Sequence, residues 1–365
     1  MFRLGIRKYS SKPLNVLFFG SDEFSALSLN ALVSLQGRTD LIKTLQVVSR
    51  PPKWCGRKKS VLKTPPIVEL CESLKLRVPL HVDTRDDMLK LDRVCEKEDI
   101  NMIIAVSFGK LIPGELLGAV PYSLNVHPSL LPRYKGSAPL QHTLLNNDNY
   151  TGVTIQTLHP TKFDHGSIVA QTAPLPVFDL LNRKPVAPLT QAEDTRPRKL
   201  KQLMDQLGLV GGHLLQEVIE QGLYINNKES STYESSYAKR ITTEDKMINW
   251  KEDTAEQLLN KLETLGPIFA FKTCQLKEKN PIIKKRVLLH DFEVINSSDA
   301  AIPVNDWDAG KFSLVDDKLV IQCKDKALLV SKIQFEACAI EDPTQFMRRL
   351  PKRCGKLYGN ELQLY

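Results

Sequence analysis

The sequence predicts an α/β fold, in which a Rossmann-like, mostly parallel sheet carries helices on both faces, followed by an OB-like β-barrel domain. Three observations support this. With 365 residues the chain exceeds the usual size of one domain, so we expect two. Short apolar runs alternate with amphipathic helical patterns up to about residue 222, which is typical of a parallel sheet. In the last hundred or so residues, short strand-like runs separated by turn-rich pieces predominate.

Apolar runs and turn residues place the elements of the first part. The run 14–20 predicts a strand ending in glycine, and the apolar pattern through Phe24 to Leu32 predicts the next helix. The same reasoning gives a strand at 41–49, a helix at 65–76, a short strand at 77–82, a charged helix around 85–98 and a strand at 102–108. Only one glycine follows the first strand, where a dinucleotide-binding turn has three, so we do not expect NAD.

The later elements end the first domain and build the second. A long helical pattern over 191–222 closes the first domain, and residues 224–238 lose hydrophobic periodicity, as a linker does. One helical pattern at 254–267 then precedes the short strands. We therefore expect a catalytic domain at 13–223, a linker at 224–238 and an OB-like domain at 239–365.

The excess positive charge lies at the N-terminal end. Residues 1–63 hold 12 Lys and Arg against 3 Asp and Glu, whereas the rest holds 38 against 39. The segment 1–12 has four basic residues, two adjacent serines and no acid, which is typical of a mitochondrial transit peptide. We expect a targeting segment at 1–12 and a location in the mitochondrial matrix. A basic disordered tail is the alternative.

Cysteine usage and hydropathy exclude several classes of protein. The seven cysteines are scattered and never occur in a C-x-x-C spacing, which supports neither a zinc site nor a disulfide framework. A reducing compartment fits this usage. No segment offers the eighteen or so unbroken apolar residues of a membrane helix. We therefore expect no metal and no membrane partner.

Polar side chains follow the apolar run at 102–108, in the stretch SLNVHPSLLPRYKGSAPL at 123–140. Along its strand, side chains alternate, so Asn125 and His127 share one face. An amide donor beside an imidazole suits acyl transfer, because the amide stabilises charge on a carbonyl oxygen while the imidazole moves a proton. Asp164, in a predicted turn between two strands of 151–172, is placed to reach His127, although Asp-x-Gly is more often only a turn.

These motifs carry a family resemblance. NVHPSLLPRYKGSAP, followed by TGVTIQTL and DHG, resembles the signature of the formyltransferases that use 10-formyltetrahydrofolate. The resemblance implies formyl transfer by Asn125, His127 and Asp164, without a metal or a covalent enzyme intermediate. It also implies folate contacts by residues of SLLP and of AVSFGKLIP, namely Ser129, Leu130, Leu131, Pro132, Phe108 and Gly109.

The resemblance extends furthest to one branch of the family, the methionyl-tRNA formyltransferases of the mitochondrial type. LFFGSDEFSALSLNAL, YAKRITTEDKMINW and LGPIFAF look like segments of these enzymes, so the match covers nearly the whole chain from residue 14. It implies formylation of the α-amine of initiator methionyl-tRNA for mitochondrial translation initiation. The chain departs from the pattern at Pro128, Lys135, Ser137 and His165, and all three catalytic residue types are intact.

A basic loop at 49–66 holds six Lys or Arg, one Trp and no acid. Such a charge run is ordinarily a solvated loop, yet cations with an aromatic side chain also suit the end of a nucleic acid. It resembles the inserted loop with which these enzymes grip the tRNA acceptor stem, which implies tRNA contacts by Arg50, Lys53, Trp54, Arg57, Lys58 and Lys59. A second basic run, 347–356, has five basic residues in ten and predicts a positive surface on the OB-like domain.

Two other functions stay open at this stage. Among enzymes, the alternative is a formyltransferase that acts on a small amine such as a nucleotide sugar. A non-catalytic RNA-binding module that kept the fold is the alternative from another class. For the methionyl-tRNA formyltransferase that the resemblance implies, we expect a monomer.

Overall fold

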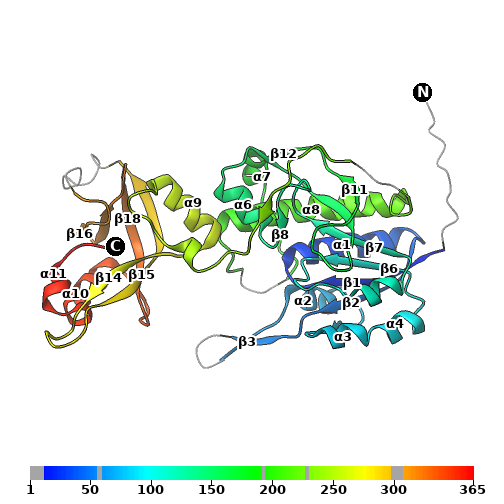
Figure 1. Ribbon diagram of the computed structural model, residues 1–365, viewed down its shortest axis with the longest axis horizontal. Coiled ribbons are helices and arrows are strands. Elements are labelled where there is room, and N and C mark those ends of the chain that lie inside the picture. Colours follow the sequence, from blue (N-terminus) through cyan, green and yellow to red (C-terminus); the bar gives the residue numbers. More distant parts are fainter. Residues whose placement is uncertain (1–11, 56–59, 191–193, 227–229, 297–306) are drawn as a thin grey trace. The chain divides into compact units, whose positions relative to one another are not determined.

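The computed structural model describes residues 12–55, 60–190, 194–226, 230–296 and 307–365 (Figure 1). They form two compact units. The N-terminal unit holds the described residues up to Thr143, with Asn147–Thr195 and Lys201–Arg240, and the C-terminal unit holds Leu144–Asn146, Arg196–Leu200 and Ile241–Tyr365.

The N-terminal unit is built on a seven-stranded sheet. Its strands are β1 Leu14–Gly20, β2 Ile42–Ser49, β5 Leu80–His81, β6 Met102–Val106, β7 Tyr122–His127, β10 Thr154–Thr157 and β11 Ile168–Gln171. Their order is β11-β10-β7-β6-β1-β2-β5, and the pairings from β7 to β5 are parallel, whereas those of β10 with β7 and β11 are antiparallel. The predicted mostly parallel sheet is confirmed.

Helices cover both faces of this sheet (Figure 1). The helices of this part of the chain are α1 Glu23–Arg38, α2 Pro66–Ser73, α3 Arg85–Leu89, α4 Asp92–Lys97, α5 Gly114–Gly118, α6 Pro139–Leu145, α7 Val177–Asn182 and α8 Arg198–Glu220. Helix α1 begins where the Asp22 side chain accepts from Ser25 N at 3.0 Å, so the turn after β1 is an N-cap and holds no glycine-rich cradle. On the other face, Met88, Cys95 and Leu116 pack on β1 and β6.

The charged helix expected around 85–98 is interrupted. Helices α3 and α4 are separated by a turn at Lys90 and Leu91, where Leu91 N donates to Met88 O and Val94 N donates to Leu91 O, a three-residue spacing tighter than that of an α-helix. Met88, Leu91 and Cys95 still share one core. Helical structure is therefore present where it was predicted, but as two short helices in place of one continuous helix.

Among the described residues, the N-terminal unit also contains three two-stranded sheets of short strands. Strands β3 Lys53–Cys55 and β4 Val61–Lys63 form a hairpin within the basic loop, and β9 Tyr150–Thr151 pairs with β12 Leu175–Pro176. Strand β13 Tyr237–Ala238 pairs in parallel with β8 Lys135–Gly136. The end of the segment expected as a linker is thus attached to the N-terminal unit.

The C-terminal unit is a curled antiparallel sheet around its own core. Its strands are β14 Ile268–Cys274, β15 Ile283–Ile295, β16 Phe312–Val315, β17 Lys318–Gln322, β18 Ala327–Phe335 and β19 Ile340–Glu341, in the order β14-β15-β18-β17-β16 with β19 beside β18. Its helices are the 3-10 turn η2 Glu244–Lys246, α9 Ala255–Leu265, α10 Pro343–Cys354 and α11 Lys356–Asn360. Phe292, Phe312 and Phe346 are buried in this core.

The C-terminal residues lie between the two outer strands of this sheet. Tyr365 exchanges two backbone hydrogen bonds with Phe271 of β14, at 2.7 and 2.8 Å. On the other side, Leu364 N donates to Gly310 O, and Gln363 forms a bridge with Lys311 just before β16. The last residues of the chain therefore continue the curl of the sheet from β16 to β14, consistent with the barrel-like fold expected.

None of the helices in the described parts of the chain has both the length and the apolar character needed to cross a bilayer.

Candidate active site

Strand β7 delivers two polar side chains to the carboxyl end of the parallel sheet. Leu124 and Val126 are buried at 1% and 2% exposure, while Asn125 and His127 lie on the opposite face, as the alternation predicted. Strand β10 pairs with β7 so that Gln156 lies across from Asn125. In an open α/β sheet this edge is where ligands bind, so the position of these side chains is that of a site.

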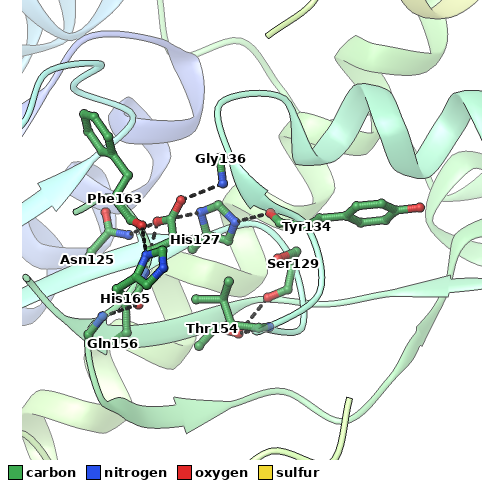
Figure 2. Close-up of polar contacts among 12 residues, drawn as sticks. Asn125, His127, Ser129, Tyr134, Gly136, Thr154, Gln156, Phe163 and His165 are labelled. Carbon is green, nitrogen blue, oxygen red and sulfur yellow. Dashed lines mark hydrogen bonds and ion pairs between the residues drawn. The ribbon is translucent and has the colours of Figure 1, made fainter. Parts of the chain in front are cut away.

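Asp164 joins these side chains into one network (Figure 2). Its Oδ1 accepts from Gln156 Nε2 at 3.0 Å and from Asn125 Nδ2 at 3.4 Å, and it lies 3.4 Å from His127 Nδ1. Its Oδ2 accepts from the Gly136 backbone N–H at 2.8 Å. The structure thus brings together the three residues predicted to be catalytic, around one carboxylate.

A tight turn holds Asp164 in place. Asp164 itself has φ +53, a left-handed conformation that Asp tolerates better than most residues. Gly166 packs so closely on β10 that a Cβ atom there would lie 1.7 Å from the carbonyl oxygen of Thr157, and its N–H donates to Gln156 Oε1 at 3.2 Å. Gln156 therefore fixes both the carboxylate and the turn that carries it.

The hydrogen bonds of His127 define the role of each ring nitrogen. Its Nε2 lies 2.8 Å from the carbonyl oxygen of Tyr134. Because a carbonyl oxygen only accepts, Nε2 carries a proton and donates it. The side chain is buried at 7% exposure, and the remaining nitrogen, Nδ1, faces Asp164. The ring is thus anchored at one end and presents the other to the carboxylate.

These side chains border a cavity of about 440 Å³ within the N-terminal unit. Asn125, His127, Gln156 and Asp164 all line it. So do the apolar side chains of Phe108, Ile112 and Leu140, each no more than 4% exposed. The combination of a mostly apolar cavity with a few convergent polar groups is typical of a site for a small organic ligand.

The predicted folate-binding residues fall into two groups. Phe108 and Gly109 line the cavity. Ser129, Leu130, Leu131 and Pro132 are not among its lining residues. They form a braced turn in which Ser129 Oγ donates to Arg133 O at 2.7 Å and Leu131 N donates to Thr154 Oγ1 at 3.0 Å. They support the loop that follows β7, and their contact with the folate stays a prediction.

The basic loop is anchored through Asp83. Its Oδ1 lies 2.6 Å from Arg50 Nη2, 3.4 Å from Lys53 Nζ and 3.6 Å from Lys110 Nζ. Desolvation raises the pKa of Asp83, but the hydrogen bond and charge of Arg50, with the charges of Lys110 and Lys53, outweigh it and lower the pKa. Two of the predicted tRNA contacts are thus partly neutralised, and Lys110, which lines the cavity, shares their partner.

The other predicted tRNA contacts differ in their placement. Trp54 is 60% exposed on β3, a position in which its ring is accessible to a partner. Arg57, Lys58 and Lys59 lie outside the described residues, as do residues 1–11 of the expected targeting segment.

Sequence reasoning missed three contributors to the site, Gln156, Gly136 and Tyr237, all of which line the cavity. The alternation of TGVTIQTL would have found Gln156, because it shares a strand face with Thr154. No local pattern marks the pairing of Tyr237 with the loop that holds Gly136. Within the described ranges, no group of three or more His, Cys, Asp or Glu side chains is placed to hold a metal ion.

Comparison with known families identifies both units. Residues 14–183 match the Formyl transferase family model, and residues 240–351 match the model of the Formyl transferase C-terminal domain.

Individual relatives match along most of the chain. The Methionyl-tRNA formyltransferase, mitochondrial, of Saccharomyces cerevisiae is 49% identical over 95% of this chain and 92% of its own length. The human Methionyl-tRNA formyltransferase, mitochondrial, is 29% identical over 80% of this chain and 65% of its own length.

Solved structures share the fold at low sequence identity. HypX from Aquifex aeolicus in complex with tetrahydrofolic acid superposes with a TM-score of 0.54 at 15% identity, over 93% of this chain and 48% of HypX. An N-formyltransferase from Helicobacter canadensis, in complex with folinic acid and dTDP-3-aminofucose, gives 0.50 at 17% identity, over 87% of this chain and 98% of that chain. These structures support the fold. The two family models and the relative from Saccharomyces cerevisiae establish that the chain belongs to the formyltransferase family, among the methionyl-tRNA formyltransferases of the mitochondrial type.

Proposed function

We propose that the chain transfers the formyl group of 10-formyltetrahydrofolate to the α-amine of initiator methionyl-tRNA in the mitochondrial matrix. The observation that carries this proposal is the convergence of Asn125, His127 and Asp164 on one cavity. The high identity to a mitochondrial relative supports the acceptor and the compartment. The folate compounds bound to HypX and to the Helicobacter enzyme support the donor.

The cavity residues fit a folate donor. The flat faces of the folate rings are matched by the buried side chains of Phe108, Ile112 and Leu140. The volume of about 440 Å³ lies within the ordinary range for small-molecule sites. The formyl end would then lie against the polar group of Asn125, His127 and Asp164.

The reaction we propose is a direct transfer. The neutral amine of methionine attacks the formyl carbon, a C–N bond forms, and the carbonyl oxygen takes up negative charge. Asn125 Nδ2 and, in the protonated imidazole, His127 Nδ1 are the side-chain donors placed to stabilise that oxygen, and donors fixed in advance are the most effective kind. The bond from the formyl carbon to the folate nitrogen then breaks, and a proton passes from the amine to that nitrogen. Asp164, through the imidazole or a water, guides this proton.

The experiment compares acceptors with labelled 10-formyltetrahydrofolate and the wild-type protein. Methionylated initiator tRNA, methionylated elongator tRNA and a UDP-amino sugar are offered separately. We expect formylation of the initiator tRNA, slower formylation of the elongator and none of the sugar. Transfer to the sugar without transfer to tRNA would overturn the acceptor assignment. The absence of both transfer and folate binding, measured by calorimetry, would overturn the catalytic role.

A further inference from the structure

The rim of the cavity carries a tyrosine that the proposed mechanism does not use. Tyr237 belongs to β13, about a hundred residues after the loop with which β13 pairs. Four hydrogen bonds fix this segment: Lys135 N to Ser236 O, Ser236 N to Pro132 O, Ala138 N to Ala238 O, and Tyr134 N to Ser236 Oγ, at 2.9, 3.2, 3.4 and 2.9 Å. The backbone that carries the ring is therefore held firmly.

The ring itself lies against Gly136 and remains open to solvent. A Cβ atom on Gly136, which has φ +110, would come within 2.7 Å of Tyr237 Cε2, so a glycine is needed for this approach. Tyr237 lines the cavity yet is 70% exposed. Gly136 N also donates to Asp164 Oδ2 at 2.8 Å. Gly136 therefore contacts both the ring of Tyr237 and the carboxylate of the proposed reacting centre.

We propose that the ring of Tyr237 is a stacking subsite for the terminal nucleobase of the tRNA acceptor strand; this inference rests on the proposed function. One ribose, one ester link and the α-carbon of the amino acid separate that base from the amine. A stacking surface is therefore required close to the catalytic carboxylate but outside the enclosed apolar part of the cavity. A rigid, exposed aromatic ring meets this requirement, because every base has a face that stacks on such a ring.

Positive charge on the same segment indicates that the ring of Tyr237 binds a nucleotide of the tRNA and not the folate. Lys239 and Arg240, two and three residues after Tyr237, are exposed, which supplies cations for a phosphate next to the stacked base. The folate ring is better matched by the enclosed side chains of Phe108, Ile112 and Leu140, which are no more than 4% exposed.

The test is a binding cycle on the full-length protein. The dissociation constants of wild type and Tyr237→Ala are measured with uncharged initiator tRNA ending in CCA and with the same tRNA lacking its terminal adenosine. For wild type we expect removal of the adenosine to weaken binding roughly five- to a hundredfold, the range for stacking of one base. For Tyr237→Ala we expect removal of the adenosine to weaken binding by no more than about twofold. An equal loss in both proteins, or no loss in wild type, would overturn the subsite.

Two control variants and the steady-state constants distinguish base stacking by Tyr237 from a structural or catalytic role. Tyr237→Phe retains the ring and should retain the wild-type difference. Phe178→Ala removes an aromatic side chain that is 75% exposed in the same unit but does not line the cavity, and it should also behave as wild type.

Tyr237→Ala should raise KM for methionyl-tRNA and leave kcat and the KM of the donor unchanged. A raised donor KM, or a fall in kcat alone, contradicts the inference. The proposed function fails separately, if wild type does not formylate methionyl-tRNA.

Discussion

At the scale of single residues, backbone contacts decide how the candidate catalytic group is oriented. The bond from His127 Nε2 to the carbonyl of Tyr134 leaves Nδ1 as the nitrogen that faces Asp164. Asp164 in turn depends on the N–H of Gly136 and on Gln156. In our mechanism, therefore, the loop after β7 orients the imidazole and the carboxylate together, because Tyr134 and Gly136 both lie in it.

His127→Ala should lower kcat by about a hundred- to a thousandfold, because it removes one oxyanion donor and the group that moves the proton. KM for both substrates should change little. Steady-state kinetics with methionyl initiator tRNA measure this. His213→Ala is the matched control, since His213 is exposed on α8 and does not line the cavity. Wild-type turnover in His127→Ala would remove this residue from the chemistry.

Gln156→Leu should lower kcat by roughly tenfold, because Asp164 loses one donor and the turn loses the acceptor of Gly166 N–H. We expect the free energy of unfolding to fall by about 1–3 kcal/mol, since Gln156 is 1% exposed and its polar neighbours lose their partner. Kinetics and urea denaturation test the two effects. An unchanged kcat would show that Gln156 does not position Asp164.

At the scale of elements, the β3–β4 hairpin divides the basic loop into an anchored base and an open face. Arg50 and Lys53 are tied to Asp83 at the base, whereas Trp54 is exposed. The charges at the base are therefore partly occupied, and the open aromatic ring is the described part of the loop best suited to bind an unpaired base.

Trp54→Ala should raise KM for methionyl initiator tRNA roughly five- to a hundredfold, with an unchanged KM for the folate donor. Initial rates at varied tRNA concentration test this. Phe178→Ala, which removes a ring that is 75% exposed elsewhere in the unit, serves as the control. If Trp54→Ala binds and uses tRNA as wild type does, the hairpin is not a tRNA contact through this residue.

The sequence predicts the long elements well and the short ones poorly. The alternation of Leu124 to His127 and the helical stripes are local signals that packing reinforces. The two-residue strands β8 and β13 are too short to show a period, and their pairing spans a hundred residues, so no local pattern reveals it. Strand alternation places Asn125 and His127 on one face, and the family resemblance adds Asp164, whereas no local signal points to Gly136 or Tyr237.

At the scale of the whole molecule, fewer basic side chains are available to bind RNA than the net charge of +8 suggests. The basic run 347–356 predicted a positive surface. In the structure Arg349 and Arg353 both pair with Glu341, whose side chain is 3% exposed. That part of the run stabilises the C-terminal unit, which leaves fewer cations for RNA than the sequence indicated.

The pKa of Glu341 is lowered, because the hydrogen bond from Arg353 outweighs burial and Arg349 adds to it. A carboxyl whose pKa is lower in the folded state stabilises the fold above its unfolded value of about 4.5, and this contribution is lost as pH falls through the folded pKa. Glu341→Gln should cost about 1–3 kcal/mol at pH 7 and less below pH 4.

Thermal unfolding of the full chain across this pH range tests the prediction. Glu256→Gln is the control, because its pair with Lys326 is exposed and contributes little. Equal effects of the two substitutions at pH 7 would contradict a structural role for Glu341.

The central claim is that His127 and Asp164 act on the same reacting centre, and a double-mutant cycle tests it most directly. The single-turnover rate of formyl transfer to methionyl initiator tRNA is measured at saturating substrates for wild type, His127→Ala, Asp164→Asn and the double variant. We predict that each single change lowers the rate by about a hundredfold or more, and that the double variant is scarcely slower than the slower single variant. Losses that multiply in the double variant would show that the two side chains act independently, and would contradict the account.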